Sequence, residues 1–363
     1  MGAGLTLRAL RSTAVLVPMA RPLGTSAQTL RHAPLLLIDL ETEQGVTGRA
    51  YLFCYLPAAA ASIARMLDEA QRVIAGASVA PQEIGATLAR HFRLLGVRGI
   101  VSMALAGIDM ACWDALAHAA GLPMATLLGA TPKPIPAYNS NGLGLMDAGA
   151  AADEAEALVA EGFAAIKMRL GRADEAADLA AVRAVRSRLA DDIALMADYN
   201  QALSLNDAHR RCRALEGEGI YWIEEPIRHD DYAGNAALTR ALDTPVQIGE
   251  NFAGPQAMAV AIAAGAADFM MPDLERIGGV SGWQRAAALA SVAGIELSSH
   301  LFPEVSAHLL AASPTAHWLE VVDWANPILA EPLKIIAGRA QPSTAPGSGL
   351  AWDDAAVARF RLD

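Results

Sequence analysis

The stretch from residue 193 to residue 251 decides the fold, and it contains the apolar runs IALMADYN (193–200), IYWIEEP (220–226) and VQIGEN (246–251). Each run closes on an acidic residue, and these residues, Asp198, Glu224 and Glu250, are 26 positions apart. A strand–helix unit of that length places the carboxyl end of each strand beside the previous one in a barrel of alternating strands and helices. We therefore predict that the three carboxylates meet at one mouth of such a barrel.

Three carboxylates that converge on one point repel one another unless a cation neutralises them. A hard divalent cation held by oxygen ligands meets this need, and Mg²⁺ is the natural choice. The spacing thus predicts a metal-dependent enzyme with Mg²⁺ as its cofactor and Asp198, Glu224 and Glu250 as the metal ligands.

Five further apolar runs bring the total to eight. Most are separated by alanine- and leucine-rich stretches of helical period, such as DLAAVRAVRSRLA (178–190). Alternating units in this number are typical of an α/β protein with a closed parallel barrel, which we place at residues 131–329. The eight runs are PIPAYNS, FAAIKMRL, IALMADYN, IYWIEEP, VQIGEN, DFMMPD, IELSSH and HWLEVV.

The first 130 residues are organised differently. Residues 5–55 are rich in strand patterns, and APLLLIDLETEQGVTGRAYLF (33–53) indicates two strands joined by a turn around Gln44-Gly45. Helical patterns follow at 57–76 and 82–93, and another ends near Gly121. We predict an α+β domain over residues 1–130, completed by a Pro-, Gly- and Ser-rich tail, 330–363, that packs back on it.

Composition and charge narrow the class of protein. With 53% hydrophobic and 18% charged residues, the chain is an ordinary globular protein, and its net charge of −11 argues against a nucleic-acid partner. The three cysteines, Cys54, Cys112 and Cys212, form no zinc-site spacing and fit a reducing compartment. No apolar run approaches the roughly 20 residues of a membrane-spanning helix. We expect a cytoplasmic protein without a membrane partner.

Polar side chains end almost every strand-like run, where a barrel has its catalytic face. Lys167 and Arg169 are two residues apart, so they point to the same side of a strand. Buried cations need anionic partners, which the metal carboxylates and an anionic substrate would supply. The set comprises Ser140, Lys167, Arg169, Asp198, Asn200, Glu224, Glu225, Glu250, Asp273, His300 and Glu320; the 26-residue rhythm selects Glu224 over Glu225.

His300 follows Asp273 by 27 residues, one strand–helix unit further along. An aspartate on the neighbouring strand fixes the tautomer of a histidine and raises its basicity. Such a base, beside a metal and cations, could remove the proton α to a carboxylate and stabilise the resulting enediolate. Glu320, kept neutral by burial among apolar residues, could donate a hydrogen bond to the same oxygen.

These residues resemble the enolase superfamily, and within it the mandelate racemase group, over nearly the whole chain. The matching segments include VPMARPLGTSAQTLRHAPLLLIDLETEQGVTG, YLFCY, AGIDMACWDAL, LMADYNQAL, WIEEP, VQIGEN, MPDLERIGGVSGW and SSHLFPEVSAHLLAASPTAHWLE. The resemblance implies a modified (β/α)₇β barrel beneath an N-terminal α+β capping domain. It also implies a small carboxylate substrate and assembly into octamers.

The resemblance further implies a role for each residue of the set. Mg²⁺ would be bound by Asp198, Glu224 and Glu250, and His300 with Asp273 would be the base on the R face of the substrate. Lys167 and Ser140 would bind the substrate carboxylate, Asn200 the substrate hydroxyl, and Glu320 would be the acid to the enediolate. Apolar side chains would cover the substrate side group: Leu23, Ala27, Leu30 and Tyr55.

The chain departs from the group at Arg169, where the second base of the family is a lysine. A guanidinium has a pKa above about 12 and stays charged, so it is a poor base on the S face but suits a carboxylate or alkoxide. Three hypotheses remain. The first is a racemase of an apolar or aromatic 2-hydroxy acid; the second is an acid-sugar dehydratase; the third is a metal-binding relic without activity. Polar groups from residues 21–32 in the substrate site would favour the dehydratase.

Overall fold

The N-terminal domain is an antiparallel sheet backed by helices. The computed structural model describes residues 4–26 and 28–362. Strands β1 (Leu7–Gly24), β2 (Thr29–Thr42) and β3 (Thr47–Phe53) pair in sequence order, and Gly45, at φ 78°, turns the chain between β2 and β3. Helices α1 (Pro57–Ile74), α2 (Pro81–His91), α3 (Ile100–Ala120) and the short α4 (Met124–Leu127) follow. The predicted strands, turn and helices of this domain are confirmed.

Helix α3 corrects one expectation. Its 21 residues are long and apolar enough, by length and composition, to cross a membrane. However, 67% of its most apolar window is buried inside the molecule, where the helix packs on β3, α1 and α11. A core helix passes the same test, so this is weak evidence for a membrane span. The sequence analysis predicted this helix but found no apolar run of that length in it, because Asp109 and Asp114 interrupt its apolar residues.

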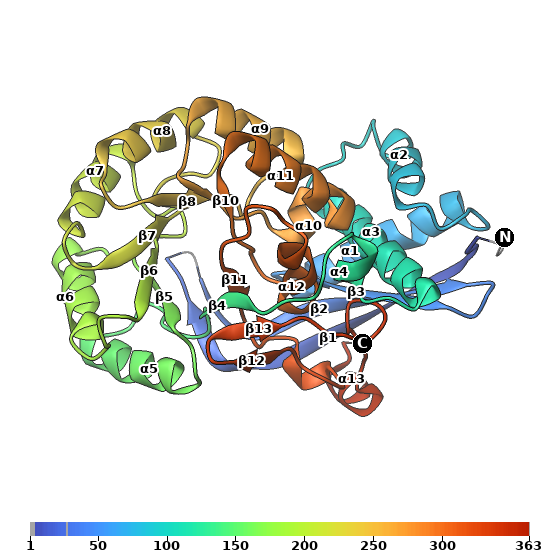
Figure 1. Cartoon of the computed structure of the whole chain (residues 1–363), viewed down its shortest axis with the longest axis horizontal. Coiled ribbons are helices and arrows are strands. Elements are labelled where there is room, and N and C mark those ends of the chain that lie inside the picture. The colour runs from blue at the N-terminus through green and yellow to red at the C-terminus, as the bar shows by residue number, and fades with distance from the viewer. Residues whose placement is uncertain (1–3, 27, 363) are drawn as a thin grey trace.

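The second domain is the parallel barrel that the eight runs predict. Its strands lie side by side in sequence order from β4 to β10, and β11 pairs with β4 to close the ring. Seven strand-to-strand connections carry helices on the outside, and no helix joins the ring after the last strand within the described chain, as in a (β/α)₇β barrel (Figure 1). The strands are β4 (Ile135–Asn139), β5 (Ala165–Arg169), β6 (Ala194–Asp198), β7 (Ile220–Glu224), β8 (Val246–Ile248), β9 (Phe269–Met270), β10 (Glu296–Leu297) and β11 (Leu319–Val321). The helices are α5 (Ala148–Ala160), α6 (Glu175–Arg186), α7 (Leu205–Ala214), α8 (Tyr232–Ala241), α9 (Pro255–Ala264), α10 (Leu274–Ile277), α11 (Gly279–Ala293) and α12 (Pro303–Ala311).

The C-terminal tail contacts both domains. After the 3₁₀ turn η1 (Asn326–Ile328), the hairpin β12 (Lys334–Ile336) and β13 (Arg339–Gln341) extends the barrel sheet at β4. Helix α13 (Asp354–Phe360) then packs on β1, where the Leu362 amide donates to the Ala14 carbonyl at 2.9 Å. The division of the chain near residues 130 and 330 stays a prediction.

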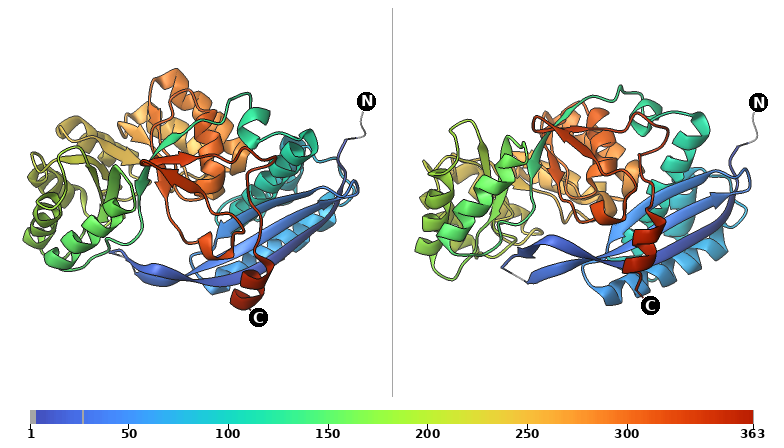
Figure 2. Two further views of the ribbon diagram at one scale, coloured as in Figure 1. Left: turned by 60° about the horizontal axis from the view of Figure 1, so that its bottom comes forward. Right: turned by 90° about the horizontal axis from the view of Figure 1, so that it is seen from below.

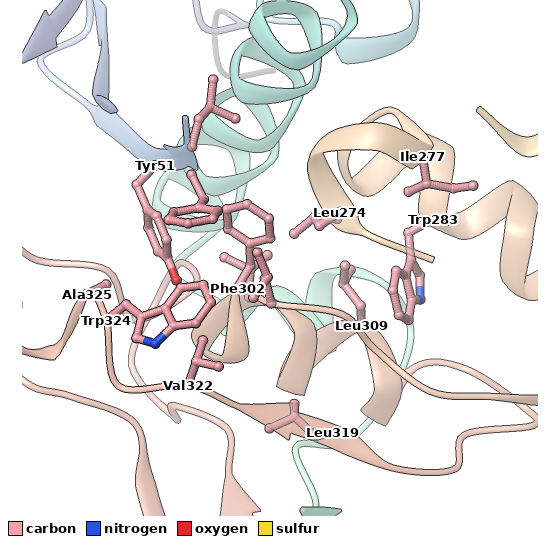
Figure 3. Close-up of a cluster of buried hydrophobic side chains, with 14 of the residues drawn as sticks. Tyr51, Leu274, Ile277, Trp283, Phe302, Leu309, Leu319, Val322, Trp324 and Ala325 are labelled. Atoms are coloured by element: carbon pink, nitrogen blue, oxygen red, sulfur yellow. The ribbon is translucent and has the colours of Figure 1, made fainter. Parts of the chain in front are cut away.

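The capping domain lies against the mouth of the barrel, as the two turned views show (Figure 2). Aromatic side chains from both domains fill the contact. Tyr51 of β3 meets Phe302 at 5.1 Å between ring centres (Figure 3). Phe53 meets Trp324 at 4.9 Å between ring centres. The tip of the β1–β2 hairpin reaches the barrel too, since the Leu145 amide donates to the Gly24 carbonyl at 3.0 Å. The barrel mouth is therefore covered by residues from the first 55 positions of the chain.

Candidate active site

The barrel strands bring the acidic residues together through their parallel register. Arg169 pairs with Asp198, and Asp198 with Glu224, at the carboxyl ends of β5, β6 and β7. Deeper in the barrel, beneath the site, side chains from four strands form a buried layer: Tyr138, Ala165, Met196 and Trp222. Side chains along a strand alternate between the inside and the outside of the barrel. The inward-facing residues that follow this apolar layer therefore lie at the mouth of the barrel.

Asp198, Glu224 and Glu250 each offer a carboxylate oxygen, and these oxygens all lie within 4.8 Å of one another. Burial raises the pKa of Glu224 to about 8, with Lys167 opposing and Asp198 adding to the rise. The Trp222 indole donates to Glu224 at 3.2 Å and holds that carboxylate in place. Three crowded oxygen ligands of this kind fit a hard divalent cation. Glu225 turns away through a backbone φ of 38° and accepts from Asn251, so it lies outside this cluster.

Lys167 lies at the centre of the acidic cluster, with only 1% of its side chain exposed. Its ammonium nitrogen is 2.6 Å from Glu224, 2.9 Å from Glu320 and 3.4 Å from Asp198. Burial lowers the pKa of Lys167, but the surrounding carboxylates outweigh this effect and raise it well above its ordinary value. Lys167 is therefore a fixed positive charge in the site.

His300 and Asp273 meet across β9 and β10. The His300 Nδ1 lies 2.7 Å from an Asp273 oxygen, which leaves Nε2 toward Glu250, at 3.3 Å. Burial lowers the pKa of His300, but Glu250, Glu320 and Asp273 raise it to about 10. Asp273 thus orients the imidazole, and the ring lies beside the cluster of Asp198, Glu224 and Glu250. A base that acts on a substrate bound at this cluster needs that position.

The surroundings of Glu320 differ from those expected. Its carboxylate accepts from the Ser140 hydroxyl at 2.7 Å and from the Leu301 amide at 2.9 Å, besides contacting Lys167. Burial raises the pKa of Glu320, yet Lys167 and His300 hold it well below its ordinary value. The prediction that apolar neighbours keep this carboxyl neutral is wrong, because the sequence does not reveal how many donors converge on it.

Arg169 is held in place by the loop after β4. Its Nη1 donates to the carbonyls of Ser140 and Gly142 at 2.8 and 2.9 Å, and its Nη2 donates to the Ser140 hydroxyl at 2.8 Å. Ser140 is fully buried and so touches Arg169 and Glu320 instead of lining the open cavity. The guanidinium is consequently fixed as a donor-only group.

A cavity of about 240 Å³ joins these groups to the capping domain. Leu23, Leu30 and Tyr55 line it as predicted; Ala27 lies outside the described residues. Asn200 also lines it, and its buried Oδ1 has no hydrogen-bond partner within the described chain, which leaves an acceptor for a substrate hydroxyl. Larger hollows, of about 390 and 780 Å³, lie at the tail and below the barrel, away from this chemistry.

Several cavity residues were missed by the sequence analysis. Phe53, Leu301 and Trp324 extend the apolar wall, while the polar part contains Thr25, Gln28, Gln201, Asn251 and Arg276. Arg21, Arg31 and His32, from the same segment, are not among the lining residues, and Arg21 instead pairs with Glu161 at 2.7 Å. The cavity therefore has an apolar wall together with a polar one.

Strained backbone is concentrated around this cavity. Of the eight described non-glycine residues with positive φ, Tyr55, Asn200, Gln201 and Leu301 line it. Such conformations cost about 1–3 kcal/mol each and are retained where the surrounding structure enforces them, most often at functional sites.

Comparison with known proteins agrees with this geometry. Residues 150–356 match the family described as enolase C-terminal domain-like, and residues 8–129 match the mandelate racemase / muconate lactonizing enzyme N-terminal domain. An enolase from alpha proteobacterium bal199, solved with bound magnesium, is 45% identical, with a TM-score of 0.97 over 99% of this chain and 100% of that one.

Two further relatives point to different substrates, one by its bound ligand and one by its name. An enolase from Bradyrhizobium, solved with magnesium and mandelic acid, is 42% identical, with a TM-score of 0.95 over 100% of both chains. The L-talarate/galactarate dehydratase of Salmonella typhimurium is 36% identical over 264 residues, which span 72% of this chain and 66% of that protein. The chain belongs to the mandelate racemase / muconate lactonizing enzyme family of the enolase superfamily, whose members are magnesium-dependent enzymes.

Proposed function

We propose that the protein removes the proton α to a carboxylate of a 2-hydroxy acid, with Mg²⁺ held by Asp198, Glu224 and Glu250. The observation that carries this proposal is the oriented pair of His300 and Asp273, which places the second imidazole nitrogen, Nε2, 3.3 Å from Glu250 in the same cavity. Bound there, Mg²⁺ would supply a positive charge that counters the negative charge developing on the substrate carboxylate.

Residues of the protein itself carry out proton transfer, stabilise the developing charge and contact the substrate. Glu250 is the carboxylate that most raises the pKa of His300, and its charge would be offset by bound Mg²⁺. The neutral His300 Nε2 then takes the α-proton from the R-enantiomer, and Asp273 stabilises the imidazolium that forms. Lys167 and Arg169 provide fixed positive charge for the enediolate, and Asn200 Oδ1 accepts from the 2-hydroxyl. Glu320, bonded to Ser140 and Lys167, lies where it would contact the substrate carboxylate.

Racemisation of an aromatic or apolar 2-hydroxy acid is the net reaction that we propose first. The apolar wall formed by Leu23, Leu30, Phe53, Leu301 and Trp324 supports it, because a hydroxyl-rich substrate would leave its polar groups unpaired there. The similar Bradyrhizobium structure with mandelic acid gives the same support.

Dehydration of an acid sugar is the second candidate, and Arg169 favours it. A guanidinium fixed by three donated hydrogen bonds is a poor S-face base, which makes His300 the stronger base of the two. In this reaction His300 takes the α-proton, the C2–C3 double bond forms, and the 3-hydroxyl leaves as water with a proton from the same imidazolium. Thr25 and Gln28 at the cavity, and the likeness to a talarate dehydratase, add to this case.

Incubation in D₂O with each mandelate enantiomer and a panel of acid sugars tests both reactions. NMR spectroscopy reports deuterium at C2 from proton removal on each face and any 2-keto-3-deoxy product. We expect deuteration of mandelate that requires Mg²⁺. A 2-keto-3-deoxy product without mandelate exchange would replace racemisation by dehydration, and no exchange on any acid would refute both. Cytoplasmic location and octameric assembly stay predictions.

A further inference from the structure

Arg276 is a positively charged residue of the cavity. Neither candidate reaction gives it a role. It belongs to α10, three residues after Asp273, and it lines the cavity. Asp273, Glu250 and Glu275 act on its charge from a distance, and within the described part of the chain its one side-chain hydrogen bond runs from Nη1 to Asn251. A partly buried guanidinium carries five N–H donors, so this arrangement leaves donors at Nε and Nη2 unused.

Tyr55 lies directly beside this guanidinium. The Arg276 guanidinium carbon is 4.9 Å from the centre of the Tyr55 ring, and that ring packs against Phe53 at 4.5 Å. The Tyr55 hydroxyl is buried and has no hydrogen-bond partner within the described residues. A buried hydroxyl left unpaired is costly, and the ring that carries this hydroxyl lies beside a guanidinium with unused donors. Two polar groups at one end of the cavity thus lack the acceptor that would satisfy them.

The order of the strands in the barrel shows on which side of the cavity Arg276 lies. Lys167 and Arg169 stand on β5, whereas Arg276 follows β9, four strands further in an eight-stranded ring. Elements four strands apart in such a ring face each other across the barrel. A substrate whose carboxylate lies at Lys167 would meet Arg276 and Tyr55 if its other end crosses the cavity.

We propose that Arg276 and Tyr55 form a subsite for an oxygen acceptor, a hydroxyl or a carboxylate, at the end of the substrate remote from its reacting carboxylate. This rests on the proposed function, because it takes the substrate to be a 2-hydroxy acid. A planar guanidinium stacked on a ring presents its edge donors to such an oxygen. The natural substrate is then a 2-hydroxy acid whose side group has an apolar middle and a polar end.

Equilibrium binding of matched acids tests this subsite. The acids are racemic mandelate, its 3- and 4-hydroxy derivatives and its 4-carboxy derivative, titrated calorimetrically into the full-length protein at saturating Mg²⁺. Racemates are chosen because racemisation does not change their composition. None of these acids has a hydroxyl on the carbon next to C2, so none can be dehydrated. We expect at least one oxygen-bearing acid to bind about tenfold more tightly than mandelate, the effect of one hydrogen bond to a charged group.

Variants separate a binding role of Arg276 from an indirect one. In Arg276→Met the preference for the oxygen-bearing acid should vanish while mandelate binding is kept, and Tyr55→Phe should reduce the same preference. Arg240→Met, which removes an exposed arginine of α8, should keep it. If Arg276→Met weakens all the acids by one factor, Arg276 acts only through Asn251 and the metal ligands, and the subsite is refuted. A wild-type protein without the preference refutes it as well. Neither readout needs turnover, so a failure of the proposed reaction is seen separately in the D₂O experiment.

Discussion

Arg169 is the residue on which the fate of the proposed enediolate depends. Arg169 lies two residues after Lys167 on β5, so the sequence predicts that both side chains face the same side. Both residues line the cavity, in agreement with this prediction. Its hydrogen bonds to Ser140 and Gly142 use the donors that a free base would need to release. Proton return on the S face is therefore the weak step of any racemisation here.

Replacing Arg169 by lysine should strengthen that step. A lysine among cations can lose its proton at neutral pH, whereas a guanidinium cannot. We expect deuterium exchange from S-mandelate to rise at least about tenfold, given that a positioned general base contributes about 10²–10⁴ in rate. A fall in exchange would mean that Arg169 positions the substrate. Arg188→Lys, at an exposed site on the barrel exterior, is the matched control.

Replacing His300 by asparagine should abolish exchange from R-mandelate. The loss should be about 10²–10⁴-fold, the usual contribution of a general base. NMR in D₂O measures the exchange, and calorimetry should show that Mg²⁺ still binds, since no proposed metal ligand changes. His209→Asn on α7 removes a histidine outside the cavity and should leave exchange unchanged. Exchange at the wild-type rate in the His300 variant would remove it from the mechanism.

At the scale of elements, the sequence predicted all eight barrel strands and the carboxylates at their ends. Periodicity and the 26-residue spacing carry that information, even for β9 and β10, which are only two residues long. The cavity wall was predicted less well. Phe53 and Trp324 line it because β3 and the segment after β11 dock together, and docking between domains leaves no periodic signal. Arg276 was missed because a lone charge in a short helix is indistinguishable from a surface residue.

Strand β3 is also tied to the barrel by two buried carboxyl groups. Glu304 of α12 accepts from the Tyr51 hydroxyl at 2.8 Å, and Glu275 of α10 accepts from the Phe53 amide at 3.1 Å. Each has a second oxygen that is buried without a partner in the described chain. Burial raises the pKa of Glu304 above its ordinary value of 4.5. The junction of cap and barrel thus contains carboxyls that resist ionisation.

The sign of the resulting pH effect follows from that shift. A carboxyl whose folded pKa is raised contributes stability below its unfolded pKa, and this contribution is lost as pH rises through the folded value. Glu304→Gln removes the ionisation, so its unfolding free energy should fall less than that of the wild type as pH rises from 4.5. Denaturant unfolding at several pH values measures this. Glu331→Gln, at an exposed neighbouring site, should follow the wild type, and equal slopes for all three proteins would contradict the assignment.

For the whole molecule, the metal site should couple ligand binding to global stability. A ligand that binds only the folded state stabilises it by about 2.7 kcal/mol at a hundred times its dissociation constant. We therefore expect Mg²⁺ to raise the Tm of the wild type, and Glu250→Gln to lose most of this rise. Differential scanning calorimetry measures both. Glu43→Gln at an exposed turn should keep the full rise, and a rise undiminished in the Glu250 variant would reject that residue as a ligand.

The β1–β2 hairpin tip over the barrel mouth has a consequence for how such proteins diverge. The side chains that would contact the substrate side group come largely from residues 23–55, whereas those proposed to move protons come from residues 140–320. Mutations in the first segment can change which acid is accepted while the bond-breaking chemistry persists. New specificities can thus arise without an inactive ancestor.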